Sequence, residues 1–372
     1  MENRYASVAY ATLGTYDRVI AISDIHGDPE GFDAVLKKTG FSDRDALVII
    51  GDILEKGAHS LELLQTVVRL SRQDNVFMVL GNNDATLQLW HTGELSDDAI
   101  HRYIHSRDYR SVFADMAQAL HLPVETESDV HALRLAVQEH FREELAFLDS
   151  LPHILDTDIA TFVHAGLKPG PLDTQDRWFC MAEKHFSRQT HRFDKPLVVG
   201  HWPSSNYRDT IVDVRVHFNP DTNVYSIDGG NSMKNWGQIN YLIFHADGQT
   251  ETGFHEAQRQ VRLLEAQCET PDPVTMIFPN TVVEILEQLP HETRCFVPYL
   301  GKEMTFGNDF IYDYNDLTYC WDFTTYRLPV RAGEIVSYCY QEGDAILVKR
   351  DGIVGKYFGA YEFLDEPDKK QS

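Results

Sequence analysis

Side chains that bind divalent metals follow five short apolar runs of this sequence. Aspartate, histidine and asparagine supply carboxylate, imidazole and amide ligands, which suit hard or borderline transition metals. Taken singly, such residues are ordinary, because an aspartate can cap a strand end and most histidines only satisfy local hydrogen bonds. Five such motifs in order predict one metal site. The candidate ligands are Asp24 and His26 in SDIHGD, Asp52 in GDILEKG, Asn82 and Asp84 in GNND, His164 in VHAG and His201 in GHWP.

The apolar runs before these motifs predict the strands that position them. Runs without polar alternation suit the central strands of a covered sheet, and stretches of helical period such as PEGFDAVLKKTG separate the first three runs. This order predicts a layered α/β domain. Since open α/β sheets bind ligands beyond the carboxyl ends of their strands, we expect the candidate ligands to converge. The runs are RVIAIS (18–23), ALVIIG (46–51), NVFMVLG (75–81), ATFVHAG (160–166) and PLVVGH (196–201).

Helical patterning from residue 87 to about 150 predicts an insertion that lies over one end of the sheet. This insertion is either a plain packing subdomain or a cap that shapes the substrate site. Farther along, residues 224–248 are expected to pair as strands around a Gly-Gly turn. Residues 255–267 (HEAQRQVRLLEAQ) are expected to form a helix.

A domain boundary is expected near residue 256, which gives a catalytic domain of residues 1–255 and a second domain of residues 256–372. The second domain is rich in aromatic and β-branched residues and in turns, which predicts a small β-barrel or meander. Its strand rhythm faintly resembles a bacterial SH3-like barrel. Its aromatic residues are expected to fill the core, with a peptide groove as the alternative. The charged tail DEPDKKQS (365–372) is expected to fray.

Composition limits the partners of this chain of 372 residues. Its 33 basic and 57 acidic residues give a formal net charge of −24, which disfavours nucleic acids and anionic membranes as main partners. We see neither a secretory signal at the N-terminus nor an apolar run of the ~18 residues that a membrane span needs. The five cysteines are scattered and odd in number, which favours reduced thiols in a cytoplasmic protein.

The ordered motifs resemble those of the calcineurin-like metallophosphoesterases, and within them the phosphoprotein phosphatase branch. That branch usually carries GDxHG, GDxxDRG, GNHE, HGG or HAG, and GHxP, where this chain has SDIHG, GDILEKG, GNND, VHAGL and GHWP. The resemblance covers roughly residues 18–245, including the SIDGGN segment. It implies an αββα sandwich-type fold and a hydrolase of phosphoric esters.

The resemblance also implies a site for two divalent transition metal ions, with manganese as the leading candidate and iron or zinc as alternatives. Two such ions ~3.5–4 Å apart can lower the pKa of a shared water and clamp the phosphoryl oxygens, so that hydroxide is the nucleophile. The implied ligands are Asp24 and His26 for the first ion, Asn82, His164 and His201 for the second, and Asp52 as a bridge between both.

This chain departs from the family pattern where substrate is bound and protonated. Lys56 replaces the phosphate-binding arginine of the family, which keeps the positive charge but loses the bidentate fork. Asn83 stands where the family has the histidine that protonates the leaving group, and Glu55 replaces the aspartate that partners it. Asp84 replaces a glutamate and is expected to support the ligands. Asp52, Lys56, Asn82 and Asn83 are therefore the candidate catalytic residues.

General acid catalysis normally contributes ~10²–10⁴ in rate, so the missing pair predicts selectivity. Leaving groups that depart without a proton, such as phenolates with a pKa of ~10 or phosphates, should suffer least. We therefore expect a preference for aryl phosphates, phosphotyrosine or anhydrides over phosphoserine. His59, His91, His101 or His105 could substitute as the acid, and neither Arg177 nor Arg188 matches the second phosphate-gripping arginine of the family securely.

Three functions follow from these residues. The leading hypothesis is a two-metal phosphatase for phosphomonoesters, with a phosphoprotein as a plausible substrate. The alternative enzyme is a phosphodiesterase or a dinucleotide-polyphosphate hydrolase. The alternative of another class is a non-catalytic adaptor that binds phosphorylated partners, which the substitutions at positions 55, 56 and 83 motivate. The oligomeric state is left open.

Overall fold

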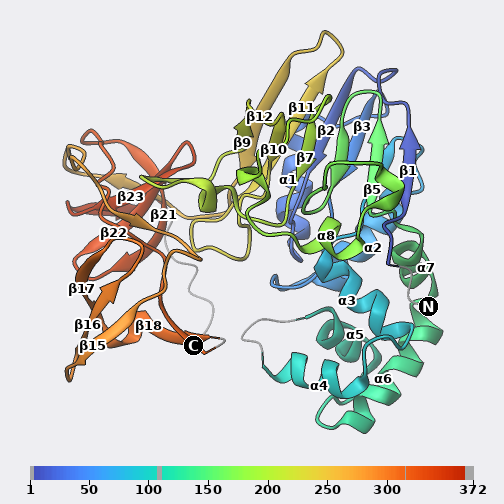
Figure 1. Cartoon of the computed structure of the whole chain (residues 1–372), viewed down its shortest axis with the longest axis horizontal. Helices are drawn as coiled ribbons and strands as arrows, with labels where there is room; N and C mark the ends of the chain where they lie inside the picture. Colours follow the sequence, from blue (N-terminus) through green and yellow to red (C-terminus); the bar gives the residue numbers. More distant parts are fainter. Residues whose placement is uncertain (1–3, 107–110, 315, 365–372) are drawn as a thin grey trace. The chain divides into compact units, whose positions relative to one another are not determined.

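The computed structural model describes residues 4–106, 111–314 and 316–364 (Figure 1). The tail 365–372, expected to fray, lies outside the described residues. None of the described helices is long and apolar enough to cross a membrane. All five cysteines are free thiols, so no disulfide constrains the chain.

The chain divides into two compact units. The first combines Met1–Ser204 with Arg215–Ala257, and the second combines Ser205–Val214 with Gln258–Ser372. The chain crosses from the first unit to the second after Ala257, close to the boundary expected near residue 256. The excursion of residues 205–214 into the second unit was not expected, because a single sequence boundary cannot describe it.

Two sheets form the centre of the first unit. One has the order β12-β11-β2-β3-β4, with β2, β3 and β4 parallel and β11 antiparallel to β2. The other has the order β1-β5-β6-β7-β10-β9, and the five expected strands form β2, β3, β4, β6 and β7. The bounds are Val8–Ala11 (β1), Arg18–Ile22 (β2), Asp45–Ile49 (β3), Val76–Met78 (β4), Ile154–Thr157 (β5), Thr161–Val163 (β6), Leu197–Val199 (β7), His217–Asn219 (β9), Val224–Ser226 (β10), Ile239–His245 (β11) and Thr250–His255 (β12).

Alternating side chains of β2 give its sheet two buried faces. Ala21 belongs to a cluster that includes Phe162 of β6 and Val198 of β7, so this face packs against the second sheet. Ile20 and Ile22 belong to the cluster that the helices share. Successive strand residues point to opposite faces, and each fully buried apolar side chain contributes about 1.5–3 kcal/mol. The layered α/β architecture expected from the sequence is therefore confirmed.

Helices cover the outer face of the sheet that contains β2. The helix α1 is fixed at both ends, because Asp28 accepts a hydrogen bond from the backbone of Gly31 and Gly40 closes the helix in the left-handed conformation. The helical insertion packs into the same core through Trp90, Phe113 and other side chains. The insertion begins at Asn82 rather than residue 87, because α3 starts directly at the GNND turn. The bounds are Pro29–Thr39 (α1), Ser60–Leu70 (α2), Asn82–His91 (α3), Asp97–His105 (α4), Val112–Leu120 (α5), Glu127–His140 (α6), Arg142–Ser150 (α7) and Arg177–Ala182 (α8).

Two local expectations from the sequence are wrong. The strands β10 and β11 do not pair around the Gly-Gly turn but lie in different sheets, joined by a segment with one isolated bridge from Gly230 to Gln238. The expected helix over residues 255–267 is instead the strand β13, Gln260–Leu263. Val261 and Leu263 are both buried, so their spacing of two residues decided the conformation against the helical period of the longer stretch.

The second unit is built from strands, as expected. Its largest sheet has the order β24-β13-β21-β22-β23-β8, and three smaller sheets accompany it. The resemblance to an SH3-like barrel stays a prediction. The remaining bounds are Val212–Asp213 (β8), Thr275–Met276 (β14), Glu284–Gln288 (β15), Glu292–Val297 (β16), Lys302–Gly307 (β17), Ile311–Tyr314 (β18), Leu317–Cys320 (β19), Phe323–Thr324 (β20), Ile335–Glu342 (β21), Ala345–Arg350 (β22), Ile353–Tyr357 (β23) and Tyr361–Phe363 (β24).

Candidate metal centre

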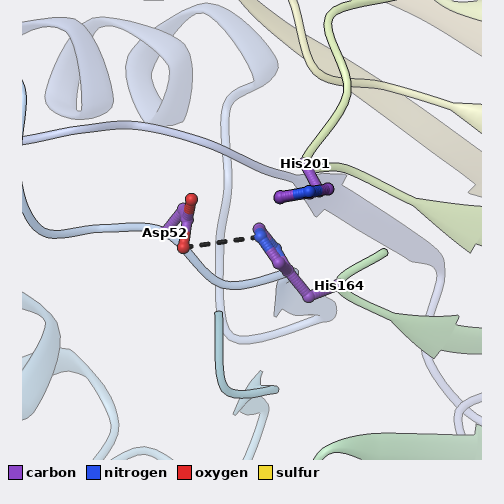
Figure 2. A group of neighbouring side chains, drawn as sticks. All are labelled: Asp52, His164 and His201. Atoms are coloured by element: carbon purple, nitrogen blue, oxygen red, sulfur yellow. Dashed lines mark ion pairs between the residues drawn. The ribbon is translucent and has the colours of Figure 1, made fainter. Parts of the chain in front are cut away.

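The candidate ligands follow the carboxyl ends of strands from both sheets and meet in one place. Asp24, His26 and Asp52 form one group, and Asp52, His164 and His201 form another, with the potential ligand atoms of each group within 4.8 Å of one another. Figure 2 shows the second group, in which His164 Nε2 lies 3.4 Å from Asp52 Oδ1. Because Asp52 belongs to both groups, its carboxylate lies between two potential ion positions.

The backbone of these loops is strained where it aims the ligands. Asp24, His26, Asp52 and His201 all have left-handed φ angles, between 52° and 64°, which cost a residue with a side chain roughly 1–2 kcal/mol. Gly51 lets two of the loops approach, because a Cβ there would lie 2.6 Å from the backbone of position 81. Such strain is maintained only where the surroundings hold it, as functional sites commonly do.

Backbone carbonyls orient two of the histidines. Nδ1 of His26 lies 3.1 Å from the carbonyl oxygen of Leu54, and Nδ1 of His164 lies 2.7 Å from that of Ile50. A carbonyl can only accept, so each Nδ1 carries a hydrogen and each Nε2 is the atom left to bind a metal. This arrangement is typical of histidines that bind metals. Nε2 of His26 points at Asp24 and Asp52, at 3.7 and 3.9 Å from their nearest oxygens.

Acceptor atoms converge where a cation would bind. Oδ1 of Asp24 is buried and has no hydrogen-bond partner among the described residues. The amide oxygen of Asn82 lies 3.2 Å from Nε2 of His164, and the opposite orientation of this amide would donate to Nδ1 of His201 at 2.9 Å. A cation favours the first orientation, because it attracts the oxygen and both imidazole lone pairs. The donor set therefore fits two divalent metal ions.

Burial and charge set the protonation of the cluster without metal. Burial lowers the pKa of His26 and of His201 to about 3, so both rings are neutral ligands. Burial alone would also lower the pKa of His164, but the charge of Asp52 raises it to about 10. Burial raises the pKa of Asp24 to about 6. One proton on His164 therefore balances part of the buried negative charge, and a cation would replace it.

Asp84 holds the loop that carries Asp52. Its buried carboxylate accepts hydrogen bonds from the backbone N–H groups of Asp52, Ile53 and Leu54 at 2.7, 3.0 and 3.1 Å. This is the supporting role expected for Asp84. Burial, followed by the nearby charge of Asp52, raises the pKa of Asp84 to about 7.

Asn83 contacts the carboxylate that both ligand groups share. Its backbone N–H donates to Oδ1 of Asp52 at 2.9 Å, and its side-chain amide donates to Oδ2. An amide does not release a proton at neutral pH, so position 83 offers no general acid. Asn83 instead restrains Asp52.

Glu55 and Lys56 point in different directions from a turn in which both have left-handed φ angles, 68° and 69°. Glu55 is fully buried and accepts hydrogen bonds from the hydroxyl of Tyr103 at 2.8 Å and the backbone N–H of Val112 at 2.9 Å. It therefore contacts the helical insertion. Nζ of Lys56 lies 3.2 Å from Nε2 of His26, which places a positive charge beside the candidate metal ligands.

The other expected residues are not in the two ligand groups. His91 pairs with Asp149 at 2.9 Å. The rings of His101 and His105 each contact a backbone carbonyl, and His59 is exposed at the start of α2. Arg177 pairs with Glu94 at 3.2 Å, while Arg188 is exposed in the short helix Phe186–Arg188. None of these residues belongs to the two ligand groups found in the described part of the chain.

Asp228 is a buried acid that the sequence reasoning did not single out. Its carboxylate accepts a hydrogen bond from the backbone of Gly230 at 2.7 Å. Burial, followed by the charge of Asp24, raises its pKa well above the usual range. Nearby in sequence, the amide of Asn231 donates to the carbonyl of Ile25 at 2.9 Å. The SIDGGN segment contains both Asp228 and Asn231, and it could have indicated this acid. Through Asn231 the segment after β10 is hydrogen-bonded to the loop of Asp24.

The sequence model of the calcineurin-like phosphoesterase family matches residues 17–248. The chain belongs to this family. The match covers every candidate metal ligand, and it makes the chain a metal-binding hydrolase. The family resemblance inferred from the five motifs is thereby confirmed.

Curated relatives of this calcineurin-like phosphoesterase match only a short segment. A symmetrical bis(5'-nucleosyl)-tetraphosphatase from Buchnera aphidicola subsp. Acyrthosiphon pisum (strain Tuc7) is 44% identical over 73 residues, which is 19% of this chain and 26% of the relative. One from Nitrosomonas europaea is 44% identical over 68 residues, 18% of this chain and 25% of the relative. The chain thus spans about a quarter of the length of these relatives.

Solved structures resemble the chain over a larger share at lower identity. A cold-active protein-tyrosine phosphatase from a psychrophilic Shewanella species is 16% identical with a TM-score of 0.40, over 68% of this chain and 84% of that one. A metallophosphoesterase from Sphaerobacter thermophilus is 19% identical with a TM-score of 0.38, over 65% of this chain and 88% of that one.

Proposed function

We propose that this chain is a metal-dependent phosphatase for phosphomonoesters whose leaving group departs without a proton, with aryl phosphates such as phosphotyrosine as the leading substrates. The observation that carries the proposal is the carboxylate of Asp52, which belongs to both ligand groups. The family membership favours this activity over a non-catalytic adaptor. A phosphorylated protein as partner and a cytoplasmic location, which the free cysteines suggest, belong to the same proposal.

Two divalent ions fit the donor set, with manganese as the leading candidate and iron or zinc as alternatives. When bound, they would supply an activated water and neutralise charge on the phosphoryl oxygens. The protein groups would fix their positions through hydrogen bonds that the histidines donate to backbone carbonyls and that Asn83 donates to the shared carboxylate. The proposed ligands are Asp24 and His26 for one ion, Asn82, His164 and His201 for the other, and Asp52 for both.

Two side chains beside the cluster would decide which substrates react. Lys56 would orient a phosphate by its charge, without the bidentate geometry of an arginine. Asn83 cannot give a proton to the departing oxygen, and the carboxylate of Glu55 accepts hydrogen bonds from the insertion. A phenolate or phosphate leaves more readily than an alkoxide under these conditions, because its conjugate acid has a lower pKa.

Symmetrical hydrolysis of a dinucleoside tetraphosphate is the second candidate. The matched relatives carry that name, although the match spans about a quarter of their length. The bond broken would be a phosphoanhydride, whose leaving group is itself a phosphate. The absence of an acid at position 83 therefore suits this substrate as well.

An activity panel with the purified full chain and added Mn²⁺ separates the candidates. The substrates are p-nitrophenyl phosphate, its bis ester, matched phosphotyrosyl and phosphoseryl peptides, and diadenosine tetraphosphate. We expect about two transition ions per chain by elemental analysis and faster turnover of the phosphotyrosyl peptide than of the phosphoseryl peptide. Asp52→Asn is the control that should lose both ions and turnover.

Faster cleavage of diadenosine tetraphosphate than of the phosphotyrosyl peptide would favour the second candidate. Faster hydrolysis of the bis ester than of the monoester would identify a phosphodiesterase. A folded chain that binds no metal and turns over none of these substrates would support the adaptor and contradict both proposals.

A further inference from the structure

The hairpin of β18 and β19 in the second unit has a core side and an outer side, and the outer side is exposed at its two ends and buried at Tyr319 between them. Ile311 and Cys320 are paired across the strands and pack into an apolar core cluster. Their neighbours along the strands point the other way, since successive strand residues alternate. On that outer side Tyr312 pairs with Tyr319, and Tyr314 pairs with Leu317.

The outer side carries a continuous row of aromatic rings. The ring centroids of Tyr312 and Trp321 lie 4.5 Å apart, those of Tyr312 and Tyr319 lie 5.7 Å apart, and those of Tyr314 and Tyr319 lie 6.3 Å apart. Tyr314 is 55% exposed and Trp321 is 54% exposed. We name these four aromatic residues, together with Leu317, the aromatic face.

Tyr314, Leu317 and Trp321 are the exposed members of the aromatic face, and Tyr319 is the buried ring between them. Large apolar side chains gathered on one surface mark an interaction site. Packing within the unit accounts for Tyr319 but not for Tyr314 and Trp321, because the core side of the hairpin is occupied by Ile311 and Cys320. Flat rings that are already packed together also lose little conformational entropy on binding.

The charge of the chain segment that contains the aromatic face selects the partner. Residues 274–326, which include the hairpin, carry eight acidic and only two basic side chains. One of the two, Arg294, is already paired with Glu287 and Glu303. The carboxylate of Asp322 lies next to the face, since it accepts a hydrogen bond from the backbone of Phe278, whose ring centroid lies 5.7 Å from that of Tyr319.

We propose that the aromatic face binds an extended peptide segment that carries both arginine and proline. Arginine stacks on aromatic rings and pairs with neighbouring carboxylates. Proline-rich segments are rigid before binding and pack their rings against aromatic grooves. Acidic partners are repelled by the surrounding charge, and the same repulsion opposes the pairing of two copies of this face.

Calorimetric titration of the full chain tests this proposal with two designed decapeptides. One alternates arginine and proline, and the other alternates glutamate and proline. We expect binding of the arginine peptide only, weakened by added salt because the charges contribute. In the double variant Tyr314→Ala, Trp321→Ala we expect the dissociation constant to rise about tenfold or more, as the loss of two stacking rings implies.

Phe358→Ala is the matched control, since Phe358 is 43% exposed in the same unit and lies outside the aromatic face. It should bind the arginine peptide like the unmodified chain. Circular dichroism establishes that each variant is folded. Equal binding of the two peptides or unchanged affinity in the double variant would overturn the proposal. So would the absence of binding at about 1 mM peptide, because specific recognition should give a dissociation constant below that concentration.

Two further results would assign the face to another occupant and overturn the proposal as well. Concentration-dependent dimerisation that disappears in the double variant would identify a second copy of the chain. Binding of a neutral oligosaccharide that the double variant abolishes, with no binding of the arginine peptide, would identify a carbohydrate.

Discussion

Replacing Glu55 by alanine should destabilise the first unit, because this carboxylate joins the metal-site loop to the helical insertion. Glu55 and Val112 are fully buried, and Glu55 accepts hydrogen bonds from the hydroxyl of Tyr103 and the backbone N–H of Val112. A buried donor that loses its acceptor costs about 1–3 kcal/mol. The fully buried N–H of Val112 contributes this range, and the partly buried hydroxyl of Tyr103 contributes about 1 kcal/mol. We therefore expect a loss of about 2–4 kcal/mol in the free energy of unfolding, or roughly 30- to 1000-fold in the folding equilibrium.

Urea unfolding of the metal-free full chain measures this loss, and hydrogen exchange at α4 and α5 locates it. Tyr103→Phe removes one donor but leaves the carboxylate, so it should cost about 1 kcal/mol. Because the two changes share a hydrogen bond, their effects should not add in the double variant. A loss below about 0.5 kcal/mol in Glu55→Ala, the range of an ordinary surface substitution, would refute the reasoning.

Three further predictions concern catalysis, metal binding and thiol chemistry. Asn83→His should raise turnover of phosphoseryl peptides more than that of phosphotyrosyl peptides. The increase could reach the ~10²–10⁴-fold in rate that a general acid supplies. Equal changes in the two rates would show that another group donates the proton. Metal affinity should fall as pH drops below about 6, because Asp24 then takes up a proton, and binding between pH 6 and 10 should release the proton of His164. Calorimetry in two buffers of different ionisation enthalpy counts that proton, and pH-independent affinity would contradict the prediction. Iodoacetamide at pH 8 should label the exposed Cys268 well before Cys180, whose pKa burial raises to about 12; mass spectrometry of the native chain measures the order.

The residues of the candidate metal centre could be predicted from sequence because each follows a strand within a few positions. An apolar run fixes the strand, and the polar residues in the few positions after it then lie at the edge of the sheet. Asp24, Asp52 and His164 needed no knowledge of long-range contacts beyond this rule. The family motifs added the pairing of ligands with each ion.

The remaining features depend on contacts between distant segments. Glu55 was interpreted through its usual partner at position 83, whereas its actual partners come from α4 and α5, about fifty positions along the chain. The strand β13 was expected to be a helix, because only its pairing with β21 and β24 buries Val261 and Leu263. No local pattern carries that information.

Because residues 205–214 belong to the second unit, a single truncation point does not separate the two units. The strand β8 pairs with β23, and Val212 within it is fully buried. A chain shortened at residue 257 would leave this strand without its neighbour, a bare apolar edge only a few positions beyond His201. An engineered catalytic fragment would therefore need a second join, in which a short linker takes the place of residues 205–214.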